Sequence, residues 1–269
     1  MLPASRRRSI LRAVGERREY APGTFCWVDL ATTNAEAAAA FYGAVLGWEV
    51  APDQDPEAGG YRLMLVGDRT VSGIYPGAAG SHPAWLSYVS VEESEASAAR
   101  AAELGATIAM GPMDVLEHGR TTLLIDPQGA HVALWEPRAH AGAGLVNDPG
   151  ALTLNQLNTH DVAGSTAFYT ALFGWEISQV ADDPAPYWGI ENQGRLNGGL
   201  MGLPPGNPAP PHWLPYFTVE DIDATDALIV EAGGTVIVPV MPAGPEGRIL
   251  VAMDPQGAAF ALFEGRVDP

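Results

Sequence analysis

The chain has 269 residues, of which 47% are hydrophobic, and it carries a formal net charge of −18 at pH 7. This length predicts roughly two domains of ~100–200 residues, and no apolar run approaches the ~18 residues that a membrane-spanning helix needs. The acidic charge argues against nucleic acid as the main ligand, because an acidic surface repels phosphate groups.

The first 20 residues are basic and hold six arginines and two acidic residues. Arg6-Arg7-Arg8 is superficially similar to a twin-arginine export signal, but the apolar stretch of ~7–15 residues that such a signal needs does not follow. We predict that residues 1–21 form a basic arm, either a mobile tail or one short helix on the body. The single cysteine, Cys26, excludes an intrachain disulfide and agrees with the cytoplasmic location that we expect.

Residues 22–138 show the pattern of alternating strands and helices. Aromatic and β-branched residues over 24–32 predict a strand, Asn34 is a good N-cap for a helix over 35–45, and Gly47 ends it. The next elements are expected in the order strands 61–66, 70–75 and 84–91, helix 93–104, and strands 107–110, 121–126 and 131–135. Within residues 22–138, one strand, one helix and several further strands therefore follow each other in this order twice.

Residues 139–150 lack periodicity and are predicted to be a linker. After the linker the first pattern repeats at a nearly constant spacing, with offsets of 168 − 41 = 127 and 254 − 126 = 128. The recurring motifs are Phe41-Tyr42 with Phe168-Tyr169, Leu46-Gly47-Trp48 with Phe173-Gly174-Trp175, and Asp126-Pro127-Gln128-Gly129 with Asp254-Pro255-Gln256-Gly257. Such self-similarity predicts two copies of one domain, 22–138 and 151–266.

These motifs resemble those of the vicinal-oxygen-chelate superfamily, which includes glyoxalase I, bleomycin-resistance proteins, fosfomycin-resistance enzymes and extradiol dioxygenases. The resemblance covers about residues 22–266. It is closer to tandem actinobacterial proteins of this superfamily, which include a mycobacterial glyoxalase-like antigen. It implies an α+β fold of two tandem domains, each built of paired βαβββ units whose sheets curl around a cavity.

Members of that superfamily that use a metal hold it at fixed strand positions. By the resemblance, these positions fall here on Trp27, Leu86, Ala133, Leu154, Leu214 and Ala261. A divalent cation needs carboxylate, imidazole, thiolate or amide-oxygen ligands, which these six side chains lack. We therefore predict no metal and no cofactor. The histidines in predicted loops are expected to be solvated, namely His82, His118, His140 and His160.

Side chains alternate across a strand, so residues two apart share a face with these positions. In the first half, the predicted acid–base group is Asp29, His131 and Tyr88, because a carboxylate raises the pKa of a nearby histidine and orients its ring. The alternative is that Asp29 and His131 only satisfy buried polar groups. The predicted ligand-binding residues of both halves are Trp27, Leu86, Trp135, Gln156, Asn158, His212 and Tyr216.

Two further groups of residues, aromatic residues of the helices and two arginines, are expected to lie outside the site. Trp48 and Trp175, like the Phe-Tyr pairs, are expected in the helix-to-sheet core. Arg120 and Arg248 are expected to pair with the abundant acidic residues, and the alternative is that they contact an anionic ligand.

The inferred cavity walls are aromatic and apolar, which favours an aromatic or polyketide-like small molecule. One function is a metal-independent enzyme that acts by acid–base chemistry, as an isomerase, lyase or cyclase, or hydroxylase-type protein. The other is a non-catalytic protein that sequesters a drug or metabolite; a ligand-responsive interaction protein has only the basic arm in its favour. The halves differ at cavity positions, with Asp29 against Gln156, which favours an enzyme with one functional cavity. We expect a monomer or homodimer, with no nucleic-acid or membrane partner.

Overall fold

The structure, a computed structural model, describes residues 15–52, 59–182, 185–244 and 247–266. The first half contains β1 Phe25–Thr32, α1 Ala35–Leu46, β2 Glu49–Val50, β3 Arg62–Val66, β4 Arg69–Pro76, β5 Ala84–Ser90, α2 Ser94–Glu103, β6 Thr107–Val115, β7 Gly119–Ile125 and β8 His131–Pro137. The second half contains β9 Leu152–Thr159, α3 Val162–Phe173, β10 Glu176–Ala181, β11 Tyr187–Asn192, β12 Arg195–Gly202, β13 His212–Thr218, α4 Ile222–Glu231, β14 Thr235–Ala243, β15 Gly247–Met253 and β16 Ala259–Glu264.

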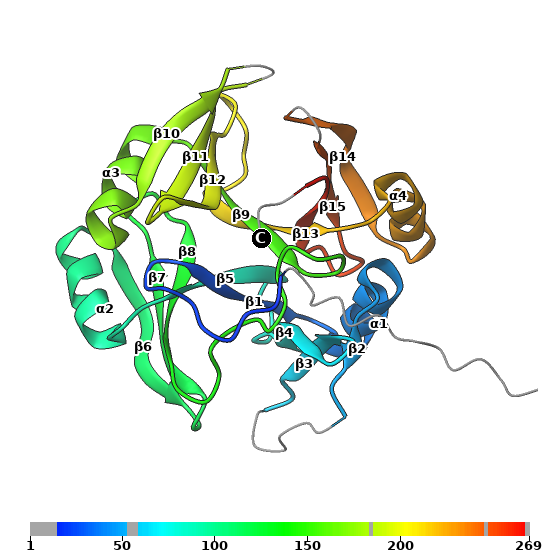
Figure 1. The fold of residues 1–269 in the computed structure, drawn as a ribbon, viewed down its shortest axis with the longest axis horizontal. Helices are drawn as coiled ribbons and strands as arrows, with labels where there is room; N and C mark the ends of the chain where they lie inside the picture. Colours follow the sequence, from blue (N-terminus) through cyan, green and yellow to red (C-terminus); the bar gives the residue numbers. More distant parts are fainter. Residues whose placement is uncertain (1–14, 53–58, 183–184, 245–246, 267–269) are drawn as a thin grey trace, which may run out of the picture.

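Each half forms one eight-stranded mixed sheet, and Figure 1 shows both sheets as open, curled ribbons. The strand orders are β2-β3-β4-β1-β5-β8-β7-β6 and β10-β11-β12-β9-β13-β16-β15-β14. In both sheets the two central strands are antiparallel to each other, and each pairs in parallel with the last strand of its own unit. The predicted α+β fold of two tandem copies is therefore confirmed.

The helix boundaries follow the expected capping chemistry. The Asn34 side chain accepts a hydrogen bond from the Ala37 amide at 3.0 Å, and Asp161 does the same for α3. Gly47 and Gly174 end the helices with φ values of 71° and 72°, which is a conformation that glycine adopts without steric cost.

Strand β6 is longer than its sequence predicts, because it continues past Gly111-Pro112 to Val115. It is the outermost strand of its sheet, and its pairing with β7 shifts in register once before this dipeptide and once across it. Proline lacks a backbone N–H, but an edge strand can leave that position without a partner.

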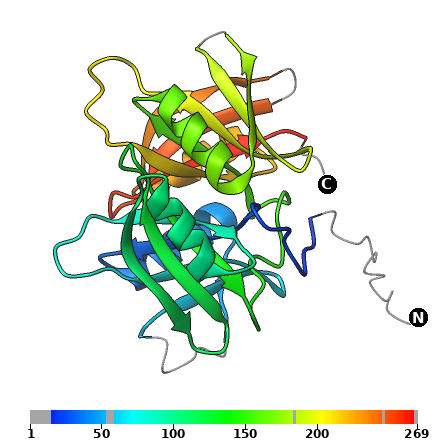
Figure 2. The same cartoon turned by 90° about the vertical axis from the view of Figure 1, so that its left-hand side faces the viewer.

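The helices lie between the two sheets, so each hydrophobic core is shared by both halves (Figures 1 and 2). Phe41 of α1 packs against Phe260 of β16 with ring centroids 5.9 Å apart. The central strands also meet, and Ser87 donates a 2.6 Å hydrogen bond to Asn155. The remaining, concave face of each sheet therefore points outward, on opposite sides of the molecule.

The repeated motifs hold the halves together in a reciprocal manner. Tyr169 donates a buried hydrogen bond to Asp126 at 2.9 Å, and Tyr42 donates one to Asp254 at 3.2 Å. Trp48 and Trp175 are 4% and 1% exposed. The Trp175 indole donates to the Gly23 carbonyl of the first half, and the Trp48 indole donates to the carbonyl of Gly150 at the end of the linker. Their predicted place in the core is confirmed, as is that of the Phe-Tyr pairs.

The linker is ordered by the chain segment that precedes β1. Glu16 forms a β-bridge with Leu145, and the Arg17 amide donates to the Gly144 carbonyl at 3.0 Å. Residues 15–20 are thus extended rather than helical, and they are packed on the body, while residues 1–14 of the predicted arm lie outside the described residues. In the described part of the chain, no helix is long and apolar enough to cross a membrane.

Candidate functional site

The concave face of the first sheet is built by alternate residues of its central strands. Val28 and Leu30 of β1 belong to the shared core, so Trp27 and Asp29 face the opposite, outward side. In register, Trp27 pairs with Tyr88 and Asp29 pairs with Leu86. The structure thus brings the predicted residues Trp27, Asp29, Leu86 and Tyr88 together.

Asp29 is the only acidic side chain of β1, and it is 4% exposed. Its Oδ2 atom accepts a 2.9 Å hydrogen bond from the Tyr88 hydroxyl, whereas its Oδ1 atom is buried and has no hydrogen-bond partner among the described residues. Burial raises the pKa of Asp29 from 3.8 to about 7, and the hydrogen bond from Tyr88 offsets only part of this effect. A buried carboxyl group with such a pKa can both accept and release a proton near neutral pH.

Aromatic residues that the sequence did not single out surround this carboxyl group. Trp27 donates a 2.9 Å hydrogen bond to the Tyr61 hydroxyl, and Tyr61 stacks on Tyr75 with ring centroids 5.8 Å apart. Burial, and then the charge of Asp29, raises the pKa of both tyrosines. The carboxylate therefore faces neutral phenols.

A glycine makes room for one of these rings. A Cβ atom on Gly73 would lie 1.8 Å from the Tyr61 hydroxyl oxygen, and one on Gly199 would lie 1.8 Å from that of Tyr187. Both pairs recur at the same spacing, since 187 − 61 = 126 and 199 − 73 = 126. This repetition is the sequence signal that could have identified Tyr61 and Tyr187.

His131 does not join Asp29 in the predicted pair. It is exposed at the first position of β8, and no hydrogen bond or ion pair connects it with Asp29 in the described structure; the partner of Asp29 is Tyr88. His131 lies two residues before Ala133, which pairs with Tyr88, so it lies at the solvent-exposed end of the same strand face.

His140 is packed against the sheet, and the expectation that it is solvated is wrong. Its ring centroid lies 4.7 Å from that of Trp27 and 6.0 Å from that of Trp135, and its backbone carbonyl accepts a hydrogen bond from Trp135. Burial, and then the nearby His118, lowers the pKa of His140 to about 4. The linker places it there because Ala143 donates a backbone hydrogen bond to Cys26 in β1.

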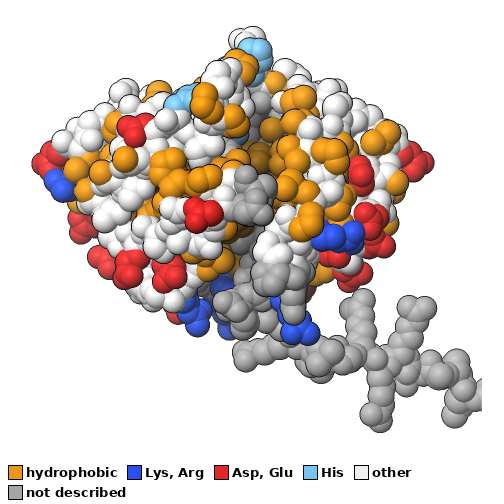
Figure 3. Space-filling view, turned by 90° about the horizontal axis from the view of Figure 1, so that it is seen from above, with side chains coloured by type: hydrophobic (Ala, Val, Ile, Leu, Met, Phe, Trp, Pro, Cys, Tyr) orange, Lys and Arg blue, Asp and Glu red, His pale blue; other side chains and the backbone are white. Residues whose placement is uncertain are grey.

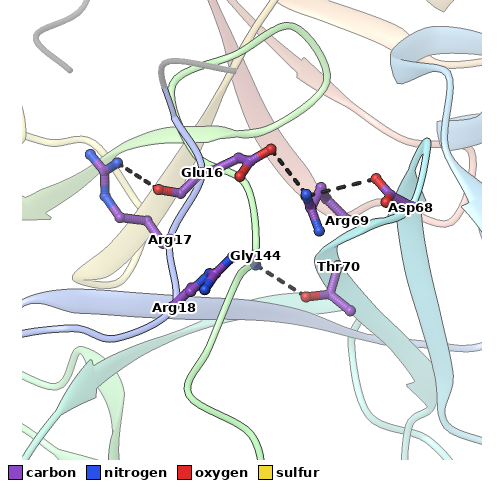
Figure 4. A pocket seen from close by; sticks show the side chains of 7 residues that line it. All are labelled: Glu16, Arg17, Arg18, Asp68, Arg69, Thr70 and Gly144. Carbon is purple, nitrogen blue, oxygen red and sulfur yellow. Dashed lines mark hydrogen bonds and ion pairs between the residues drawn. The ribbon is translucent and has the colours of Figure 1, made fainter. Parts of the chain in front are cut away.

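The linker and the N-terminal segment therefore cover one end of the first concave face. Tyr20 donates a 2.7 Å hydrogen bond to the Ala143 carbonyl, and both pack with Trp27 and Trp135 in one cluster. Figure 4 shows the outer edge of this cover, where Arg69 bridges Glu16 at 3.0 Å. The uncovered part of the face lies toward Leu86, which is partly exposed.

The second concave face carries a chain of four polar side chains in which all hydrogen bonds run in one direction. Tyr216 donates to Gln156 at 2.9 Å, and Gln156 donates to Asn158 at 2.9 Å. The Asn158 amide contacts Nε2 of His212 at 3.2 Å, and Nδ1 of His212 contacts the Pro210 carbonyl at 2.8 Å. An amide nitrogen can only donate and a carbonyl can only accept, so Nε2 of His212 is the acceptor and Nδ1 is the donor in this chain.

The surroundings of this chain are apolar. Leu214 and Tyr216 pack with partly buried Leu154, Ile249, Val251 and Phe263. Leu196 of β12 is 66% exposed. Its equivalent in the first half is Thr70, since 196 − 126 = 70, and the hydroxyl of Thr70 accepts a hydrogen bond from Gly144 of the linker. The linker thus contacts the first half at a position that is exposed in the second. Figure 3 looks onto this face and shows hydrophobic side chains gathered on it.

The donor set of neither face fits a divalent cation. The six positions that the resemblance assigns to metal ligands carry only indole or hydrocarbon side chains. Among the described residues, no three or more His, Cys, Asp or Glu side chains converge in a way that could hold a metal ion.

Two arginines elsewhere are paired with acidic side chains. Arg120 pairs with Asp114 at 2.9 Å, and Arg248 pairs with Glu264 at 2.7 Å, which confirms the predicted pairing of both arginines. Two surface hollows lie apart from the acid–base residues: one of about 160 Å³ at the Arg69 ion pairs and one of about 650 Å³ beside α3. Neither contains a predicted site residue.

Comparison with known proteins matches residues 24–134 and 151–262 to the family described as the Glyoxalase/Bleomycin resistance protein/Dioxygenase superfamily. A similar protein is the putative glyoxylase CFP32 of Mycobacterium tuberculosis, which is 35% identical over 93% of this chain and 97% of its own length. The anthracycline biosynthesis protein DnrV of Streptomyces peucetius is 31% identical over 92% of this chain and 95% of its own length.

Solved structures share the fold. The Mn(II)-bound glyoxalase from Novosphingobium aromaticivorans matches with a TM-score of 0.65 and 13% identity over 90% of this chain and 82% of that chain. The 2,3-dioxygenase LapB from Pseudomonas sp. KL28 matches with a TM-score of 0.63 and 17% identity over 95% and 94%. At these identities the likeness concerns the fold alone.

Proposed function

Because this chain belongs to the glyoxalase/bleomycin resistance protein/dioxygenase superfamily, we propose that it is a small-molecule tailoring enzyme that acts without a metal, by acid–base chemistry, on an aromatic or polyketide-like metabolite. The observation that carries this proposal is the Asp29 carboxyl group, whose pKa of about 7 arises from burial on the first concave face. Relatives named for anthracycline biosynthesis support the substrate class.

In this mechanism Asp29 removes a proton from the bound substrate and returns it at another position. Tyr88 is a positioning residue: its hydrogen bond to Oδ2 fixes the carboxyl group and favours the ionised form. The rings of Trp27 and Tyr61 offer flat surfaces on which an aromatic substrate can stack. These steps support isomerisation, cyclisation or elimination and need no co-reactant.

No step of this mechanism passes through a metal ion. The solved structures of this fold include a Mn(II)-bound glyoxalase. In this chain, the strand positions that the superfamily resemblance assigns to metal ligands hold side chains such as Trp27 and Leu86, which offer no ligand atom. The charge that develops on the substrate would instead be balanced by hydrogen bonds from neutral donors.

The second candidate function is sequestration of a metabolite or drug, and the second concave face favours it. That face combines an apolar surface with a hydrogen-bonded chain of Gln156, Asn158, His212 and Tyr216, which is the usual composition of a small-molecule site.

One experiment separates the two functions. The full chain is incubated in D₂O buffer with hydroxylated naphthoquinones and anthraquinones, and the recovered compounds are analysed by mass spectrometry. An enzyme returns a rearranged product or substrate with deuterium on carbon, and Asp29→Asn abolishes both changes. A sequestering protein binds the same compounds and returns them unchanged.

A further inference from the structure

The two halves differ at two paired positions next to the acid–base group. Asn158 and His212 of the second half correspond to Ala31 and Ala84 of the first, since 158 − 127 = 31 and 212 − 128 = 84. The structure preserves this correspondence, because Asn158 pairs with His212 in register and Ala31 pairs with Ala84. The first half thus has two methyl groups where the second has an amide and an imidazole.

Because of this difference, both polar ends of the Gln156 side chain have a hydrogen-bond partner, whereas one oxygen of Asp29 has none in the described structure. Gln156 accepts from Tyr216 and donates to Asn158, so both ends of its amide are bonded. Asp29, its counterpart, accepts from Tyr88 through Oδ2 only. Its Oδ1 atom is buried and unpaired in the described structure, and leaving a buried acceptor without a partner is costly.

The short side chains of Ala31 and Ala84 also leave the first concave face more exposed next to Asp29. Ala84 is exposed and Ala31 is partly exposed, whereas Asn158 is 5% exposed. Tyr75, which pairs with Ala31 in register, forms the neighbouring wall with its ring stacked on Tyr61. The second half fills the same place with its own side chains.

We propose that the substrate of the first face is a neutral phenol whose ring lies over Ala31 and Ala84, beside Tyr75, and whose hydroxyl group donates a hydrogen bond to Oδ1 of Asp29. This inference rests on the proposed function, because it assigns to Asp29 the substrate group that it contacts. The phenol takes the place that Asn158 and His212 occupy in the second half, and its hydroxyl supplies the partner that the protein lacks.

The electrostatic surroundings select a neutral donor. The titratable groups that face Asp29 are Tyr61, Tyr75 and Tyr88, and no cationic side chain shifts its pKa. A phenolate would be repelled by the ionised carboxylate, and an ether or ketone oxygen would have no hydrogen to offer. A phenol hydroxyl satisfies Oδ1 without adding charge.

Three probes of the same shape test this choice: 2-naphthol, 2-methoxynaphthalene and naphthalene. Binding to the full chain is measured by calorimetry at pH 8, where Asp29 is mostly ionised. We expect 2-naphthol to bind about tenfold more tightly than 2-methoxynaphthalene, because a hydrogen bond to a charged acceptor is among the strong ones. Equal affinities for the three probes, or no binding of 2-naphthol, would overturn the proposal.

Variants test whether the preference for the hydroxylated probe arises at Asp29 and at the space over Ala31 and Ala84. Asp29→Asn places an amide N–H where Oδ1 was and is expected to reverse the order, so that 2-methoxynaphthalene binds at least as tightly as 2-naphthol. Ala31→Asn combined with Ala84→His copies the second half and is expected to weaken 2-naphthol binding by about tenfold or more. Arg100→Ala removes an exposed ion pair on α2, away from both concave faces, and it must leave the preference unchanged. A preference that survives Asp29→Asn contradicts the proposal.

Failure of this inference is distinguishable from failure of the proposed function, because the probes report binding and not turnover. A hydroxyl preference that depends on Asp29, without turnover of any compound, supports the inference and contradicts the proposed enzymatic function. Turnover that depends on Asp29, with no hydroxyl preference, supports the enzyme and overturns the inference.

Discussion

Tyr88 donates a 2.9 Å hydrogen bond to Asp29 on the first concave face. The same bond recurs in the second half, where Tyr216 donates to Gln156 at 2.9 Å. The two halves therefore share a phenol–acceptor pair and differ in its acceptor, which is a titratable carboxyl group in the first half and an amide in the second. Each half thus serves as a control for the other.

Replacement of Asp29 with Asn is expected to lower turnover of the true substrate by about 100-fold or more, because an amide cannot take up the transferred proton. Gln156→Met is the matched control and is expected to leave turnover within a few-fold of wild type. Steady-state kinetics of both variants checks this, and an Asn variant with wild-type kcat would exclude Asp29 as the base.

The folded protein is expected to lose stability between about pH 4 and pH 7 through Asp29. Because the pKa of this carboxyl is raised from 3.8 to about 7 in the folded state, that state binds more protons than the unfolded chain in this window. The loss is roughly 2–4 kcal/mol and is complete above pH 7. Urea denaturation at pH 5 and pH 8 measures it. Asp29→Asn should lack this component, so parallel pH curves for both proteins would contradict the assignment.

Removal of the Tyr88 hydroxyl in Tyr88→Phe is expected to raise the pKa of Asp29 further, because the lost hydrogen bond favours the ionised form. The ascending limb of the kcat/KM profile, which follows ionisation of the base, should therefore move to higher pH. Tyr216→Phe breaks the equivalent bond to Gln156 and should leave the profile in place. A shift of equal size in both variants would point to a general structural effect.

The reciprocal bonds between the halves should each contribute measurably to stability. Tyr169→Phe leaves Oδ2 of buried Asp126 without its donor, and a hydrogen bond to a charged group contributes about 1.5–3 kcal/mol. Tyr42→Phe should cost a similar amount through Asp254. Arg100→Ala, which removes an exposed ion pair with Glu103, should change the free energy of unfolding by less than about 0.5 kcal/mol.

Purified protein is expected to contain no stoichiometric divalent metal, and prolonged dialysis against a chelator should leave its turnover unchanged. The reason is the donor set, since the strand positions of the expected ligands hold side chains such as Ala133 and Leu214. Elemental analysis before and after dialysis provides the measurement. One bound transition metal per chain, lost together with activity, would refute the proposed mechanism.

The order and type of the elements followed from local chemistry in the chain. Alternation in β1, the caps at Asn34 and Gly47, and the spacing of the motifs were each sufficient without tertiary information. The place of Asp29 and Tyr88 on one face also followed from alternation, counted from Trp27 and Leu86, the positions that the resemblance assigns to the cavity. The end of β6 did not, because tolerance of Pro112 depends on its being an edge strand.

The sequence by itself determined that one strand–helix pattern occurs twice, which side chains share a strand face, and that the expected metal positions hold no ligand atoms. Only the tertiary structure decided that the halves share their cores, that Tyr61 and Tyr75 close around Asp29, and that the linker carries His140 onto Trp27. These contacts join residues far apart in the chain, and they depend on how two curled sheets pack. A periodic pattern encodes which face a residue occupies, but not which distant segment covers that face.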